Sequence, residues 1–192
     1  GMERSWKMLG KKPRMIFINR TDEDNSDYAS CLDALKGKFG QAIAPIVAPV
    51  IDGNKKVTAI VDLLHNKAYD AKGECAIPGD MADEVEALRA ELMEAAAGAD
   101  EELMEKFFGG EAFTTEEIVD GMRKGVKDGL ITPVFCGSAV NQQALDMLLY
   151  NMHKLLPSPE HNSVLAENAN GEPVELTCAE SEPTAAYVFK TV

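Results

Sequence analysis

The sequence predicts an α/β fold that is interrupted by an α+β segment and ends in a short β tail. Two apolar segments, 14–18 and 131–136, each lead through a turn of polar or small residues into an amphipathic segment. That is the strand, loop, helix order of α/β proteins. Between them the pattern becomes β-rich and then acidic and helical, so the α/β pattern stops and later resumes.

The first elements follow from apolar spacing and from glycines. We expect a helix over Ser5–Leu9, a strand over Arg14–Ile18 and a helix over Asp24–Phe39. Gly10 and Gly40 stand where the two helices should end. Because the first helix is so short, we expect the natural chain to begin further upstream.

A β-hairpin is expected next. Its strands are Ile43–Ile51 and Val57–Leu64, on either side of the turn residues Asp52-Gly53-Asn54. Pro45 and Pro49 lack a backbone donor, so the first strand should lie at the edge of a sheet.

The acidic region that follows should be helical. Asp80 stands at the N-cap position of its first helix. Thr114 and Glu117 form a capping box, which predicts the start of a later helix. The expected helices are 80–97, 100–108 and 114–127.

The α/β pattern resumes with a strand over Ile131–Cys136 and a helix over Asn141–Leu156, which Pro157 ends. The side chains expected to face inward on that helix are Leu145, Leu148, Leu149, Met152, Leu155 and Leu156. A β-like stretch from about residue 174 closes the chain, with PTAAYVFKTV as its last strand. That strand lacks a visible partner, so we expect the natural chain to continue.

Composition limits the classes of function. The net charge is −13 and the pI is about 4.6. Such a surface repels phosphate backbones, so we expect no direct nucleic-acid binding. No apolar run is long enough to span a bilayer, which predicts no membrane partner. The four cysteines are scattered, without metal-site spacing, so we expect no metal ligands and a reducing cytoplasm.

Two loops carry the functional signal. Asn19, Arg20 and Asp22 follow the first strand, and Ser138 and Ala139 follow the second. In open α/β sheets, ligands bind at the carboxyl ends of the strands. If the two strands are neighbours, Asn19, Asp22, Ser138 and Ala139 converge on one crevice.

The chemistry of this set fits guanine. The Asp22 carboxylate can accept hydrogen bonds from N1 and N2 of guanine, a donor pair that adenine lacks. A backbone N–H after Ser138 can donate to the ring carbonyl, Asn19 can brace one loop against the other, and Arg20 can cover the ring. The same groups would be left unpaired by adenine, which is the basis of strong discrimination.

Other readings of the same residues stay open. Asn19-Arg20-Thr21-Asp22 can be a polar turn that caps the next helix, with Asp22 or Asp24 as the N-cap. A different α/β enzyme could use Asp22 or Ser138 in its chemistry, although no base or nucleophile partner is evident in the sequence.

The segment from Asp80 to Lys106 contains ten acidic residues, opposed only by Arg89 and Lys106. It can be a solvated helix face or a docking surface for a basic partner. The second possibility supports an alternative function, a non-enzymatic acidic protein-interaction module.

The chain resembles a translational GTPase, in particular elongation factor G. Asn19-Arg20-Thr21-Asp22 is similar to the Asn-Lys-x-Asp base-recognition motif of that family, and Cys136-Gly137-Ser138-Ala139 is similar to its Gly-Ser-Ala loop. The likeness continues, in the same order, through VTAIVDLL, EELMEKFFGGE, LLPSP and EPTAAYVFKTV.

The resemblance implies a partial P-loop GTPase sheet. Residues 1–40 and 130–159 would be the C-terminal half of the GTPase domain, 41–129 an inserted α+β subdomain, and 160–192 a linker and the first strand of a β-barrel domain. The parent protein would use GTP with Mg²⁺ in ribosomal translocation. The acidic insert helices would meet the ribosomal stalk protein.

The sequence departs from the family pattern. Arg20 replaces the family's lysine, and Ala144 stands where the family usually has glycine. No G-x-x-x-x-G-K-[ST] phosphate loop occurs in the chain. We therefore expect the chain alone to hydrolyse no GTP and to bind GTP or GDP weakly or not at all, with no catalytic or metal-binding residue of its own.

Overall fold

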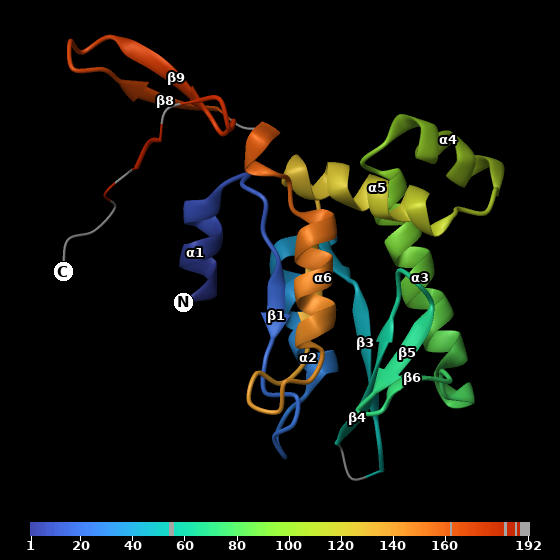
Figure 1. The fold of residues 1–192 in the computed structure, drawn as a ribbon. Helices are drawn as coiled ribbons and strands as arrows, with labels where there is room; N and C mark the ends of the chain where they lie inside the picture. The colour runs from blue at the N-terminus through green and yellow to red at the C-terminus, as the bar shows by residue number, and fades with distance from the viewer. Residues whose placement is uncertain (54–55, 162, 183, 187, 189–192) are drawn as a thin grey trace. The chain divides into compact units, whose positions relative to one another are not determined.

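A computed structural model describes residues 1–53, 56–161, 163–182, 184–186 and 188 (Figure 1). The chain forms two compact units, 1–156 and 157–192, which are considered separately. In the described part of the chain, every helix is too short or too polar to cross a membrane.

A parallel sheet of three strands organises the first unit, in the order β1-β7-β2. The strands are β1 (Ile16–Ile18), β7 (Thr132–Cys136) and β2 (Ile43–Pro45). β1 pairs with β7 in a register that opposes Ile18 to Cys136, so the turns that follow both strands lie at one edge of the sheet. Every residue of β7 is buried, as expected for the central strand.

The second sheet is antiparallel, with four strands in the order β3-β4-β5-β6. These strands are β3 (Val47–Ile51), β4 (Val57–Asp62), β5 (Lys67–Asp70) and β6 (Gly73–Cys75). The predicted hairpin of β3 and β4 is confirmed, and Pro45 and Pro49 both lie on edge strands, as expected.

The single strand predicted over Ile43–Ile51 is wrong, because the chain changes sheets at Ile46. The Ile46 N–H donates to Val134 O of β7 at 2.9 Å, and Ile46 O accepts the Leu63 N–H at 3.0 Å. Residues 43–45 therefore extend the parallel sheet, whereas residues 47–51 begin the antiparallel one.

Six α-helices surround the two sheets in the described residues. Figure 1 shows α2 and α6 on opposite sides of the parallel sheet, and α3, α4 and α5 grouped beside the antiparallel one. Their bounds are α1 Met2–Leu9, α2 Tyr28–Phe39, α3 Ala82–Ala97, α4 Glu101–Gly109, α5 Thr115–Lys127 and α6 Leu145–Leu155; short 3₁₀ turns cover Gly40–Ala42, Gly79–Met81 and Pro159–His161.

Helix starts differ from the predictions wherever another residue takes the cap. Asp27 accepts the Ser30 N–H at 2.9 Å and caps α2, so neither Asp22 nor Asp24 does. Asp80 lies in a 3₁₀ turn, and the N-cap of α3 is Met81, without a side-chain cap. The capping box of Thr114 and Glu117 is confirmed.

Helix α6 begins at Leu145 rather than at Asn141. Gln142 and Ala144 have φ angles of 57° and 61°, a left-handed conformation that a helix cannot contain. Leu149 and Met152, expected inside, are 62% and 40% exposed.

The second unit contains a hairpin of β8 (Ser163–Glu167) and β9 (Pro173–Thr177). The predicted last strand, 183–192, lies largely outside the described residues. Its four described positions, 184–186 and 188, have no strand structure.

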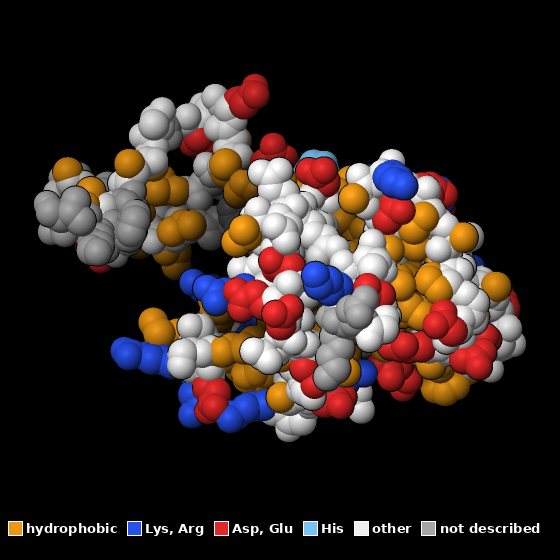
Figure 2. Space-filling model, turned by 90° about the horizontal axis from the view of Figure 1, so that it is seen from below, with side chains coloured by type: hydrophobic (Ala, Val, Ile, Leu, Met, Phe, Trp, Pro, Cys, Tyr) orange, Lys and Arg blue, Asp and Glu red, His pale blue; other side chains and the backbone are white. Residues whose placement is uncertain are grey.

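The acidic region forms an exposed surface, because nine of its ten acidic side chains are exposed. Among the described residues, only Glu91 and Asp100 of this set form ion pairs, with Lys36 and Lys124. Lys106 pairs instead with Glu117 of α5, so it does not neutralise this surface. Figure 2 shows acidic side chains gathered on the side of the molecule that carries α3.

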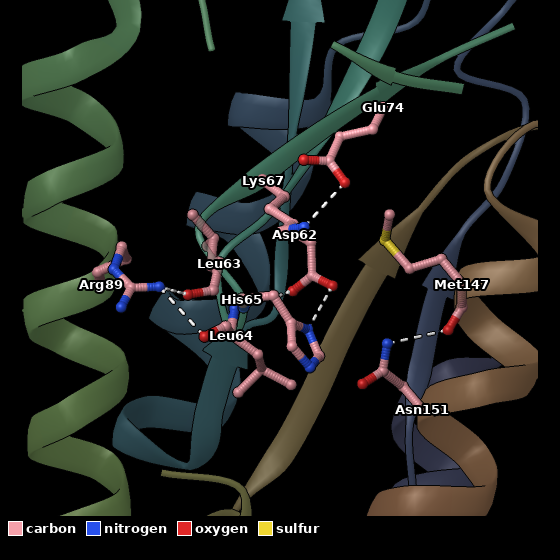
Figure 3. A network of polar contacts seen from close by, with 9 residues as sticks. All are labelled: Asp62, Leu63, Leu64, His65, Lys67, Glu74, Arg89, Met147 and Asn151. Atoms are coloured by element: carbon pink, nitrogen blue, oxygen red, sulfur yellow. Dashed lines mark hydrogen bonds and ion pairs between the residues drawn. The ribbon is translucent and has the colours of Figure 1, made fainter. Parts of the chain in front are cut away.

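Arg89, the other basic residue of this region, faces inward toward the turn between β4 and β5 (Figure 3). Its guanidinium donates to the carbonyls of Leu63 and Leu64. In the same turn, the buried Asp62 carboxylate accepts the Leu64 N–H at 2.9 Å and contacts His65 Nδ1 at 2.8 Å. This network joins α3 to the antiparallel sheet, so Arg89 does not neutralise the acidic surface.

The cap of α4 gives a test of the helical region. Asp100 accepts the N–H groups of Glu102 and Leu103, at 3.0 and 3.2 Å, and pairs with Lys124. The Lys124 ammonium, followed by the Leu103 N–H, holds the pKa of Asp100 below its ordinary value. We expect Asp100→Ala to lower the free energy of unfolding at pH 7 by about 1 kcal/mol, measured by urea unfolding.

The pH dependence of this loss has a definite sign. Because the folded-state pKa of Asp100 is lowered, its contribution is present above the unfolded-state pKa of about 4 and disappears as the pH falls through the folded value. Asp80→Ala is the matched control, since Asp80 caps no helix, and should change stability by less than about 0.5 kcal/mol. Equal losses for both variants at pH 7 would contradict the assignment.

Candidate functional site

Asn19 joins the two loops that were expected to meet. It directly follows β1, and its Oδ1 accepts the Ala139 N–H at 3.0 Å and the Arg20 N–H at 2.8 Å. Ala139 belongs to the loop after β7, so one side chain holds both loops at the same edge of the sheet.

Backbone hydrogen bonds continue the β1–β7 pairing into these loops. The Gly137 N–H donates to Ile18 O at 3.1 Å, and the Thr21 N–H donates to Gly137 O at 3.2 Å. A Cβ at position 137 would lie 2.3 Å from the carbonyl oxygen of Gln143. Glycine is therefore required here by a close approach of two backbone segments.

Asp22 lies beside the second loop. Its Oδ2 accepts a hydrogen bond from Asn141 Nδ2 at 2.9 Å. Its Oδ1 accepts none from the part of the chain that the structure describes, and the residue is half-buried. One carboxylate oxygen is thus anchored, and the other keeps its acceptor capacity.

Ser138 has a different environment from the one expected. Its side chain is fully buried, and its Oγ accepts the Asn141 N–H at 3.1 Å. Its backbone exchanges two hydrogen bonds with Gln143, at 3.2 and 2.9 Å. Ser138 therefore shapes the loop from inside, whereas Ala139 is exposed at its tip.

Arg20 is held by its backbone rather than by packing. Its φ angle is 65°, and its side chain is 72% exposed. The guanidinium lies 3.3 Å from the Glu23 carboxylate, an exposed ion pair of the kind that contributes little to stability. The side chain can therefore reorient at low cost.

A hollow of about 200 Å³ lies next to these loops, against the start of α2. Asn19, Arg20 and Thr21 line it together with Tyr28 and Cys31, but Asp22 and Ala139 do not. The hydroxyl of Thr21 is buried without a hydrogen-bond partner among the described residues. The hollow and the Asp22–Ala139 group are thus separate, and Asn19 is common to both.

The site offers no activated nucleophile among the described residues. The described hydrogen bonds of the Ser138 hydroxyl include only the one from a backbone N–H, with no base. Burial raises the pKa of the neighbouring Cys136 thiol to about 12, so this group stays protonated. The arrangement provides acceptors and donors for binding rather than groups for covalent chemistry.

Asn141 and Gln143 are site residues that the sequence reasoning missed. Gln143 Nε2 also donates to Val57 O of β4, at 3.2 Å. The apolar pattern begins directly after both residues, so the sequence predicts that they lie in the first turn of a helix. The polar run Asn141-Gln142-Gln143 next to Ser138 was the available signal.

The chain is similar to parts of two known proteins. No family model matches the chain. An elongation factor G-like protein from Thermotoga maritima is 35% identical over 193 residues, which cover 99% of this chain and 28% of that protein. A crystal structure of a protein from Thermus thermophilus superposes with a TM-score of 0.75 and 31% identity, over 86% of this chain and 26% of that one.

The chain thus spans less than a third of the length of either protein. The predicted fold class, a partial GTPase-type α/β sheet with an α+β insertion and a short β tail, is confirmed by this likeness and by the strand order. Over nearly its whole length, the chain is similar to one part of an elongation factor G-like protein.

Proposed function

We propose that this chain carries the guanine-recognition loops of a longer, GTP-binding translation factor. The observation that carries the proposal is the joint position of Asn19, Asp22 and Ala139 at one sheet edge. The longer protein would hydrolyse GTP with Mg²⁺ and drive movement on the ribosome, in the cytoplasm, as the similarity to the Thermotoga elongation factor G-like protein leads us to infer.

Each residue has a proposed role in holding the base. Asp22 reads N1–H and N2–H of guanine through its two carboxylate oxygens. Ala139 donates its N–H to the ring carbonyl, and this N–H can be shared between that carbonyl and Asn19 Oδ1. Arg20 covers the ring face, Asn19 braces the loops, and Ser138 shapes the turn from inside.

The phosphates and the magnesium ion would be held by other parts of the longer protein. The chain has no G-x-x-x-x-G-K-[ST] loop, and its described residues include no group of three or more metal ligands. We therefore propose residues 1–40 and 130–159 as half of a nucleotide domain, 41–129 as its insertion, and 160–192 as the start of the next domain.

The acidic surface supports a protein partner. Phe107 and Phe108, which are 37% and 80% exposed, lie at the end of α4, the same helix that carries Glu101, Glu102 and Glu105 of this surface. Exposed aromatic groups within a charged surface are typical of docking sites. We propose that this surface meets a basic region of the ribosomal stalk protein. The same observation favours the alternative function, a non-enzymatic acidic interaction module.

A single substitution tests base recognition. Asp22→Asn in the longer protein replaces a carboxylate acceptor by an amide donor, which clashes with guanine N2–H but matches the 2-carbonyl of xanthine. We expect the affinity for GDP to fall by about 100-fold or more and the affinity for xanthosine diphosphate to rise, both measured by calorimetry.

Asp24→Asn is the matched control, because it removes the same charge from an exposed neighbour in the same loop. Its GDP affinity should stay within about threefold of wild type. A wild-type longer protein that binds no GDP, or an Asp22→Asn variant that still prefers GDP, would refute the proposed function. If nucleotides have no effect on the longer protein, the alternative function as an interaction module is favoured.

Charge reversal tests the partner surface. Glu94→Lys changes an exposed side chain of α3 without removing a described ion pair, whereas Glu91 is paired with Lys36. In the longer protein, we expect stalk-dependent GTP turnover on ribosomes at low salt to slow by about threefold, because steering is lost. Asp33→Lys on α2 makes the same charge change away from this surface. Equal rates for the two variants would remove the docking proposal.

A further inference from the structure

Asn141 contacts both loops of the site with different atoms. Its side-chain Nδ2 donates to Asp22 Oδ2 at 2.9 Å, and its backbone N–H donates to Ser138 Oγ at 3.1 Å. No other described residue makes a hydrogen bond to the Asp22 carboxylate. The orientation of that carboxylate therefore depends on Asn141.

A half-buried aspartate without this contact would rotate. The terminal torsion of aspartate has a broad energy profile, so the carboxylate plane is poorly defined unless a partner holds it. Reading two adjacent N–H groups requires the plane of the carboxylate to match the plane of the base. A partner that fixes the plane before binding reduces the ordering cost of binding.

The turn that carries Asn141 is itself rigidly anchored. Gln143 exchanges both backbone hydrogen bonds with Ser138, and its side chain donates to Val57 O of the antiparallel sheet. Gln142 and Ala144 adopt the left-handed conformation on either side of Gln143. Asn141 is thus presented to Asp22 from a fixed backbone, not from a loosely held loop.

We propose that Asn141 is a positioning residue that determines guanine selectivity by fixing the Asp22 carboxylate; this rests on the function proposed above. An oxygen of a carboxylate has two acceptor positions, so Oδ2 can bond Asn141 and the base together. Asn141 acts through Asp22 and need not touch the nucleotide.

The test compares GDP with inosine diphosphate, which lacks the 2-amino group, in the longer protein. Asn141→Ala should weaken GDP binding by about tenfold and inosine diphosphate binding by about threefold, so that the preference for GDP narrows. A general loss of structure would weaken both nucleotides equally. Asn141→Asp, which faces Asp22 with a second negative charge, should weaken GDP binding further and be relieved by salt.

Gln142→Asn is the matched control. Gln142 lies in the same turn, is exposed and makes no side-chain hydrogen bond among the described residues, and asparagine tolerates its left-handed backbone. The Gln142→Asn variant should prefer GDP over inosine diphosphate to the same extent as wild type.

A second measurement needs no nucleotide. In the 192-residue chain itself, exchange of the Asn141 side-chain amide with water, followed by NMR, should be slower than that of Gln142, and Asp22→Ala should abolish the difference. If wild type binds GDP but Asn141→Ala keeps the full preference, or if the amide is never protected, the inference is wrong. If wild type binds no GDP at all, the proposed function falls, and this inference with it.

Discussion

The parallel pairing of β1 with β7 is the constraint on which the site depends. It aligns the ends of two strands that are far apart in the sequence, with Ile18 opposite Cys136. Val134, Phe135 and Cys136 are at most 1% exposed, so β7 forms part of the core and its register is strongly specified. A shift of one residue would turn every side chain of β1 to the other face and separate Asn19 from Ala139.

The same central strand also explains how a large segment is accommodated between the two loops. β2 pairs with the other side of β7, and Ile46 connects β2 directly to the first strand of the antiparallel sheet. The segment therefore leaves and re-enters the parallel sheet at adjacent strands. Gln143 adds a direct contact from the second loop to β4, so the loop geometry and the antiparallel sheet support each other.

Much of the fold follows from local sequence, but the site follows only in part. Apolar runs predict β1 and β7, and the Thr114 capping box predicts α5, because burial and capping are encoded within a few residues. The sequence suggests Asp22 or Asp24 as the cap of the second helix, whereas the folded backbone places Asp27 at the N-cap of α2. The left-handed conformation of Ala144, and with it the role of Asn141, depends on contacts between distant loops that no local pattern contains.

The central claim is that these two loops hold a guanine base between them, and a crystal structure of the longer protein with GDP tests it most directly. The account predicts that the Asp22 carboxylate lies within hydrogen-bond distance of N1 and N2 of the base, that the ring carbonyl faces the Ala139 N–H, and that Asn141 remains on Asp22. A base bound elsewhere, with the Asp22 carboxylate bonded only to Asn141, would contradict it.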